Sequence, residues 1–179
     1  MPNNPGTSVQ LGGLFDRIIE GGPTRSAPMS FTVELWFKTT QSGKLIGFES
    51  TRDLVSSRFD RTVHIDASGR VVYGAWTPET TKIVRTPRSY ADGAWHHLAV
   101  GVSSTSTSSS ARIYVDGLKV AEGPATVPSS YAGWWRVGFG TMPNRADVPI
   151  ATLNGQLDTV AVFDHEVSPG RINVHYSRR

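Results

Sequence analysis

The feature that most constrains the fold is a β-hairpin signal in the middle of the chain. Residues 113–120 have the sequence Ile-Tyr-Val-Asp-Gly-Leu-Lys-Val, in which Asp116 and Gly117 separate two apolar runs. Both central residues of a type I′ turn need positive φ angles, which Asp-Gly adopts readily. Residues 95–103 are typical of a preceding strand, and a polar Ser/Thr segment over 104–110 joins the two. The sequence therefore predicts three consecutive antiparallel strands here.

The same alternation of apolar and polar residues recurs along the chain. Over residues 31–38, Phe, Val, Leu and Phe alternate with Thr, Glu, Trp and Lys, so one face of this strand lies in a core. Trp36 falls on the other face, which predicts that this face is covered or forms a groove. About 11 to 13 short strands recur at intervals of roughly 8–12 residues, which predicts an all-β, two-sheet antiparallel jelly-roll sandwich. A single helical turn is expected after Ser168-Pro169, with Ile172 and Tyr176 four residues apart.

Composition excludes several classes of protein. The chain of 179 residues has no cysteine, so it has neither disulfides nor thiolate metal sites. No run approaches the roughly 20 apolar residues of a membrane span, so no membrane insertion is expected. The 18 basic residues give a net charge of +3 but are scattered, and therefore predict no nucleic-acid partner. The start of the chain lacks the features of a signal peptide, which leaves a removed leader, an excised domain or another export route open.

Three segments carry a resemblance to a known family. They are residues 31–38, residues 92–100 (Asp-Gly-Ala-Trp-His-His-Leu-Ala-Val) together with Ile113–Gly117, and residues 153–163 followed by Ser168-Pro169. In combination they resemble laminin G-like (LamG) domains of the concanavalin A-like lectin/glucanase superfamily. The resemblance is strongest to modules of high-GC Gram-positive bacteria and of their phages. It covers roughly residues 7–177, so we expect one LamG-like domain over 1–179, with 1–6 as a linker or an added start.

The two adjacent histidines of the second segment are interpreted as structural. Neighbouring residues of a strand point to opposite faces, so His96 and His97 cannot chelate one metal ion together. We expect one ring to be buried and hydrogen-bonded to the backbone, and the other ring to lie on the opposite surface.

Catalysis is not expected. The resemblance implies that enzymes of this sandwich carry two or three carboxylates on one strand, in an alternating spacing that places acid and nucleophile on one face. Glu34 is alone in its strand, and no other catalytic motif is present. The chain is therefore predicted not to be an enzyme.

A structural calcium ion is the metal that the resemblance implies, at the sandwich edge where the first and last strands meet. Asp158 matches the aspartate of the family's closing strand, and Asp16 stands near the place of an N-terminal acidic ligand. Calcium prefers several oxygen ligands of this kind. The alternative is that Asp158 only binds backbone amides or an arginine.

A glycan site would combine an aromatic platform with planar hydrogen-bonding groups at one rim. Adjacent Trp134 and Trp135 face opposite ways, so one of them lies in the core, and core packing is the alternative role for the other aromatic residues as well. The candidate ligand-binding residues are Arg52, Asp53, Arg61, Trp76, Trp135, Asn144, Arg145 and Asp147.

The leading functional hypothesis is a non-catalytic recognition module, extracellular or on a cell surface, that binds a carbohydrate or cell-surface glycan. The alternative is a structural or assembly domain of a phage particle, a pilus or a bacterial surface structure. Its partners would then be copies of itself, a scaffold protein or a surface protein, and its location would include the virion. The fold hosts both roles and does not decide between them.

Overall fold

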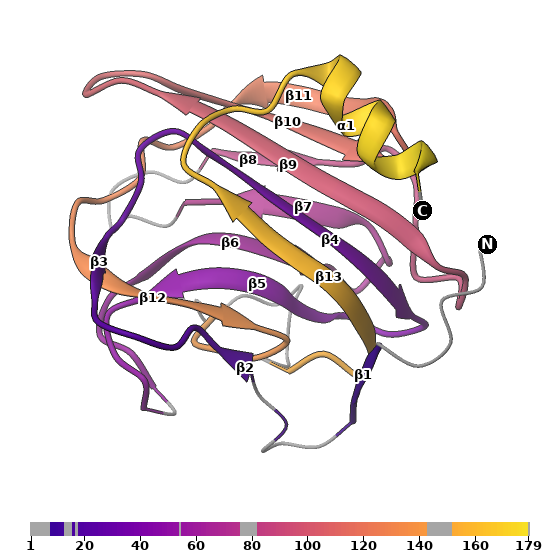
Figure 1. Cartoon of the computed structure of the whole chain (residues 1–179), viewed down its shortest axis with the longest axis horizontal. Helices are drawn as coiled ribbons and strands as arrows, with labels where there is room; N and C mark the ends of the chain where they lie inside the picture. Colours follow the sequence, from indigo (N-terminus) through magenta and orange to yellow (C-terminus); the bar gives the residue numbers. More distant parts are fainter. Residues whose placement is uncertain are drawn as a thin grey trace.

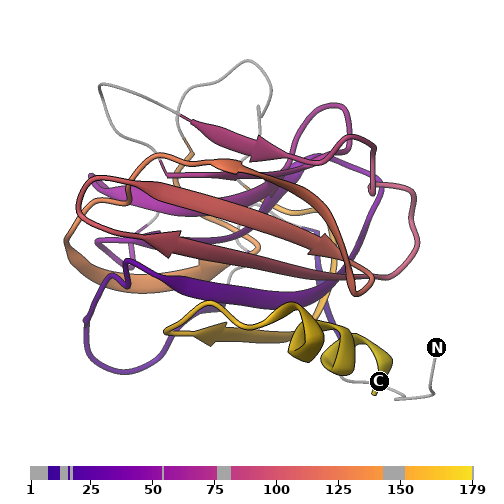
Figure 2. The same ribbon diagram turned by 90° about the horizontal axis from the view of Figure 1, so that it is seen from above.

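The computed structural model describes residues 8–12, 16, 18–53, 55–75, 82–142 and 152–178. It places two antiparallel β-sheets face to face, with one helix on the outside (Figures 1 and 2). The described residues form thirteen strands and this helix, which confirms the predicted jelly-roll sandwich. In this part of the chain, no helix combines enough length with enough apolar character to cross a bilayer.

The first sheet has six strands in the order β1-β13-β4-β9-β10-β11. Its strands are β1 (Val9–Leu11), β4 (Phe31–Thr39), β9 (His96–Ser104), β10 (Ser109–Val115), β11 (Leu118–Pro124) and β13 (Gly155–Phe163). The turn between β10 and β11 is the predicted two-residue hairpin, because Val115 pairs with Leu118 and the φ angles of Asp116 and Gly117 are 53° and 79°.

The second sheet has the order β2-β12-β5-β6-β7-β8, and β3 pairs with β12 beside this path. Its strands are β2 (Ile18–Ile19), β3 (Arg25–Ser26), β5 (Gly43–Glu49), β6 (Phe59–Ile65), β7 (Val71–Gly74), β8 (Ile83–Arg85) and β12 (Ala132–Val137). The apolar alternation that marks strands elsewhere in the chain is absent from β3 and from the start of β6 at Phe59. Asp60 and Arg61 form a buried ion pair inside this strand, which removes the apolar alternation that would have revealed it.

The core lies between the two sheets. The alternating residues of β4 (Phe31, Val33, Leu35 and Phe37) are fully buried, as predicted. Phe31 packs against Tyr73 of the opposite sheet, with ring centroids 6.2 Å apart. Each such aromatic side chain removes a large apolar area from water, which is the main source of stability in a sandwich of this size.

The helix α1 (Pro169–Ser177) lies across the outer face of the six-stranded sheet (Figure 1). The side chain of Ser168 caps it by accepting a hydrogen bond from the backbone amide of Arg171, and Pro169 occupies the first turn. Ile172 is fully buried in a small apolar cluster with Ala99 and Tyr114. The helix is therefore attached to β9 and β10 as a second layer, outside the main core.

Candidate ligand-binding groove

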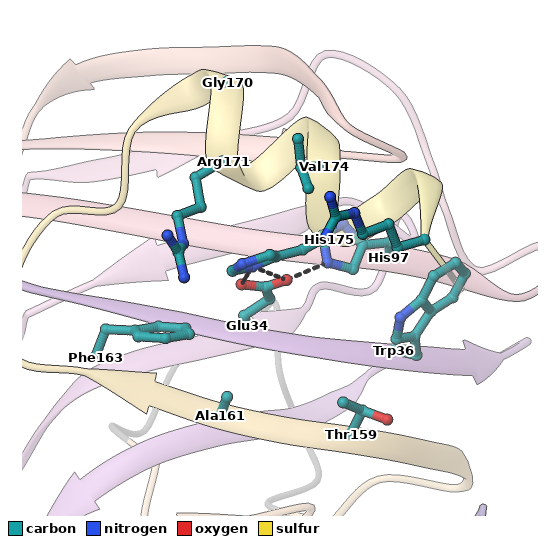
Figure 3. Close-up of a pocket in the computed structure, with 11 residues that line it drawn as sticks. Glu34, Trp36, His97, Thr159, Ala161, Phe163, Gly170, Arg171, Val174 and His175 are labelled. Carbon is teal, nitrogen blue, oxygen red and sulfur yellow. Dashed lines mark hydrogen bonds and ion pairs between the residues drawn. The ribbon is translucent and has the colours of Figure 1, made fainter.

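A groove opens between α1 and the outer face of β4, β9 and β13, and its volume is about 750 Å³ (Figure 3). It lies on the outer face of β4, which the position of Trp36 in the sequence predicted to be covered or to form a groove. The lining residues are Glu34, Trp36, His97, Thr159, Ala161, Phe163, Gly170, Arg171, Val174, His175 and Arg178.

The strand register brings the sheet residues of the groove together. Trp36 of β4 pairs with His97 of β9, and Glu34 pairs with Ala161 of β13. Because successive side chains of a strand point to opposite faces, Glu34 and Trp36 both point away from the core that Leu35 enters. The outer face of three neighbouring strands thus forms the floor.

A β-bulge in β13 shapes one side of the groove. Between the pairs Asp158–Trp36 and Ala161–Glu34, two residues of β13 lie against one residue of β4. Thr159, the first of the two, has a φ of 47°. A bulge changes which face the following side chains occupy, and here Ala161 and Phe163 both line the groove. Ala161 is small, so it leaves open space opposite Glu34.

Glu34 is held by two histidines from different elements (Figure 3). His97 Nε2 lies 2.7 Å from Glu34 Oε1, and His175 Nδ1 of α1 lies 2.9 Å from Oε2. Burial of Glu34 favours the protonated form, but the hydrogen bonds and charges of the two histidines outweigh it and lower the pKa of this carboxyl below its ordinary value. Glu34 is therefore an anion that joins α1 to the sheet.

Aromatic rings surround this carboxylate. Trp36 stacks on Tyr176 of α1 with centroids 5.9 Å apart, and its ring lies 5.2 Å from that of His97. At the other end, Phe163 stacks on His175 at 6.1 Å. Both ends of the groove therefore combine an aromatic surface with a planar polar group.

The helix contributes a polar face of its own. Arg171, Val174, His175 and Arg178 are spaced i, i+3, i+4 and i+7, so they share one side of α1. Figure 3 shows the side chain of Arg171 extending from the helix toward Phe163, beside His175. This set was missed at the sequence level, although the predicted helix start at Ser168 and the spacing of these residues could have revealed it.

The prediction for the two adjacent histidines is partly confirmed. Their rings do lie on opposite faces, since His96 contacts Phe37 and His97 contacts Trp36. Both are buried, however, at 8% and 1% exposed. His96 Nδ1 lies 2.8 Å from a carboxylate oxygen of Asp116, so both rings bind carboxylates rather than backbone groups, and neither lies on the surface as expected.

Two of the predicted rim residues, Arg52 and Asp53, are exposed but lie near the seven-stranded sheet. The guanidinium of Arg52 lies 4.8 Å above the ring of Trp134 and donates to the backbone oxygens of Glu20 and Gly22. The backbone oxygen of Asp53 accepts a hydrogen bond from Arg136. These residues are therefore not part of the groove beneath α1.

The rim positions expected for Arg61 and Trp135 are wrong, because both side chains are interior. Arg61 is fully buried, binds Asp60, and donates to the backbone oxygens of Pro28 and Ser129, each at 2.9 Å. Trp135 is 6% exposed and packs against Phe31 and Phe48, so Trp134 is the outward member of its pair. The candidates Trp76, Asn144, Arg145 and Asp147 lie outside the described residues.

The two expected calcium ligands do not converge. Asp16 accepts a hydrogen bond from the backbone amide of Gly12, beyond the end of β1 where Leu11 pairs with Gly155. Asp158 lies past the other end of this pairing, about 10 Å beyond Gly155 along β13, and accepts from the hydroxyl of Thr159. Among the described residues, no group of three or more His, Asp or Glu side chains is placed to hold a metal ion. The arrangement therefore does not fit one site that uses both aspartates.

A second charged cluster lies on the face of the seven-stranded sheet that points away from the core. Lys44 Nζ is 2.6 Å from Glu49 Oε1, and Arg136 binds the other oxygen of Glu49. All three side chains are fully buried. The backbone amide of Thr141 donates to Glu49, and a Cβ at Gly140 would lie 1.9 Å from the same carboxylate. We call these residues, Lys44, Glu49, Arg136 and Thr141, the sealed network.

Comparison with known proteins identifies the family. The family model described as the concanavalin A-like lectin/glucanases superfamily matches residues 20–173. The chain belongs to this superfamily. A search of curated proteins finds no match.

Two solved structures have a fold similar to that of this chain. A heptameric SAP-like pentraxin from Limulus polyphemus is 14% identical, with a TM-score of 0.66 over 93% of this chain and 79% of that one. The CBM40 of the Ruminococcus gnavus IT-sialidase, bound to α2,3-sialyllactose, is 14% identical, with a TM-score of 0.62 over 84% of both chains. At this identity, the likeness shows the fold alone.

Proposed function

We propose that this chain is a non-catalytic carbohydrate-recognition module of a secreted or surface-displayed protein, and that its ligand occupies the groove beneath α1. The observation that carries the proposal is the combination of aromatic and planar polar side chains around one open cavity. Sugars present apolar ring faces bordered by hydroxyl groups, so they need both kinds of contact. Phe163 and Trp36 offer the first, and Glu34, His175 and Arg171 offer the second.

The family supports the same class of function. Its description includes lectins, and the CBM40 with the same fold is bound to a sialylated sugar in its solved structure. Because fold does not imply function, the proposal depends on the groove itself rather than on these likenesses.

The composition of the groove favours binding over catalysis. Hydrolysis of a glycosidic bond requires two carboxylates, about 5–9 Å apart, on either side of the scissile bond. Of the described residues that line the groove, Glu34 is the only carboxylate. Its two oxygens accept hydrogen bonds from His97 and His175, which hold it as an anion and leave no acidic proton for a leaving group.

The decisive experiment fills the groove. Ala161→Trp places a large ring opposite Glu34, and we expect it to abolish binding of any oligosaccharide that the wild type binds on a glycan array or in titration calorimetry. The matched control is Leu118→Trp, which introduces the same ring at a position that is 67% exposed on β11. Melting curves verify that both variants fold. A saccharide that binds Ala161→Trp as tightly as wild type contradicts the groove as the site.

One observation favours the assembly function as a second candidate. β4 pairs with one edge of β13, and β1 pairs with the other edge over Gly155–Leu157 only. Among the described strands, none pairs with the remainder of that second edge. Val160 and Val162 on this edge are 37% and 38% exposed. An open, apolar strand edge can pair with another chain. Analytical ultracentrifugation tests this: a monomer at high protein concentration that binds a saccharide rules out self-assembly through β13.

A further inference from the structure

Resting on this proposed function, we infer that the groove beneath α1 selects an anionic saccharide, a sugar chain that carries carboxylate or sulfate groups. The inference starts from the charges that line the groove. Two guanidinium groups, those of Arg171 and Arg178, lie along it with one carboxylate, that of Glu34. Among the described residues that line the groove, the arginines therefore outnumber the carboxylates by two to one.

The single carboxylate does not neutralise these arginines by contact. Glu34 is bound by His97 and His175, whose rings occupy both of its oxygens. Within the described residues, Arg171 and Arg178 make no ion pair, whereas Arg25, Arg85 and Arg112 each bind a carboxylate. The two guanidiniums thus keep their hydrogen-bond donors available for a ligand.

The spacing of the two arginines suits an extended ligand. They are seven residues apart on one side of α1, which separates them by about 10 Å along the helix axis. His175 lies between them on the same side, above the stacked ring of Phe163. A sugar chain that lies along the groove would meet an aromatic surface at each end and two cationic groups along the helix that forms one wall.

Guanidinium groups favour this chemistry for a geometric reason. The planar fork of arginine donates two parallel hydrogen bonds to a carboxylate or a sulfate, and such charge-assisted bonds are stronger than neutral ones. A neutral sugar offers no partner of this kind. We therefore expect anionic groups on the ligand to distinguish strong binders from weak ones.

The test compares four probes with the folded wild-type chain by titration calorimetry. They are oligogalacturonate, a neutral galacto-oligosaccharide of the same length, dextran sulfate and dextran. We expect at least one anionic probe to bind about tenfold more tightly than its neutral counterpart, and added salt to reduce the difference. The ranking of oligogalacturonate against dextran sulfate shows whether carboxylate or sulfate is preferred.

The variant Arg171→Ala/Arg178→Ala should remove this preference, so that an anionic probe and its neutral counterpart bind with similar affinity. Both residues are exposed, and alanine is the best helix former, so α1 should remain folded. The matched control is Arg58→Ala, an exposed arginine near the other sheet that forms no ion pair within the described residues.

Three results would overturn the inference. Equal affinity for anionic and neutral probes, with binding still lost in Ala161→Trp, would refute the charge preference and keep the proposed function. Loss of affinity in Arg58→Ala equal to that in the double variant would attribute binding to overall charge. Equally tight binding of a single-stranded oligonucleotide, sensitive to the double variant, would assign the groove to a different class of ligand. Failure of every saccharide to bind would refute the proposed function itself.

Discussion

The groove beneath α1 and the sealed network contain similar residues in opposite settings. Each has one glutamate that accepts hydrogen bonds from two basic side chains, on the face of a sheet that points away from the core. In the sealed network all charged side chains are fully buried, whereas His175 in the groove is 28% exposed. The same chemistry therefore occurs in two settings: in the sealed network it is closed and fixes loops on the sheet, and beneath α1 it is partly open and borders a groove.

Burial also determines how the two glutamates respond to acid. The pKa of Glu49 is lowered because Lys44 and Arg136 outweigh the effect of burial, and that of Glu34 is lowered in the same way by its two histidines. A carboxyl whose pKa is lower in the folded state stabilises the protein above its unfolded pKa and loses this contribution as the pH falls through the folded pKa. Both clusters should therefore weaken in acid, and their variants separate the two contributions.

The largest effect is expected for Glu49→Ala. It would leave Lys44 and Arg136 buried without their anion, and breaking a buried pair in this way costs about 3–5 kcal/mol of unfolding free energy. Urea denaturation at neutral pH measures the loss. Glu122→Ala is the control, because its ion pair with Lys119 is exposed and should contribute little. A small loss in Glu49→Ala would contradict the view that the network is sealed.

A smaller effect is expected for Glu34→Gln. The amide keeps the shape but can accept fewer hydrogen bonds, so we expect a loss of about 1–3 kcal/mol at pH 7. Since the lowered pKa of Glu34 stabilises the fold above about pH 4, the difference between wild type and variant should shrink as the pH falls below this value. Denaturation at a series of pH values tests this, and a difference that is constant down to pH 2 would argue against an ionised Glu34.

The smallest effect is expected for Arg52→Ala. Its guanidinium stacks on Trp134 at an exposed position, where such a contact contributes about 0.5–1 kcal/mol. Saccharide affinity should not change, because Arg52 lies outside the groove. A large loss of affinity in this variant would move the ligand to the rim residues that include Arg52, which the sequence analysis proposed as ligand-binding.

The sequence was sufficient for the sheets because their signals are local. The alternation around Phe31–Phe37 and the turn at Asp116-Gly117 depend only on neighbouring residues, and both are confirmed. Trp134 and Trp135 point to opposite faces of β12, and which of them enters the core depends on how the strand is placed in its sheet. The sequence therefore predicted only that one of the two is buried. Arg61 was predicted at the rim for a similar reason. It forms a buried ion pair with Asp60 inside β6, and two charged residues in succession interrupt the apolar alternation that indicates a buried strand.

The groove was harder to predict because it is assembled from distant parts of the chain. Trp36 indicated that the outer face of β4 was not simply exposed, and the helix after Ser168 was predicted. Nothing local connects the two, since alternation describes one strand at a time. Only the register of β4 with β9 and β13, together with the position of α1, brings Glu34 to His175.

The hydrogen bond between Glu34 and His175 joins residues that are 141 positions apart. Ribosomes release a chain from its amino-terminal end, so β4 is made early, whereas His175 follows only after every described strand of both sheets has been made. The groove can therefore form only after the two sheets have left the ribosome. A protease that cuts between β13 and α1 would leave both sheets with their main core, yet would detach the helix that forms one wall of the groove, so a single cleavage separates the fold from the groove.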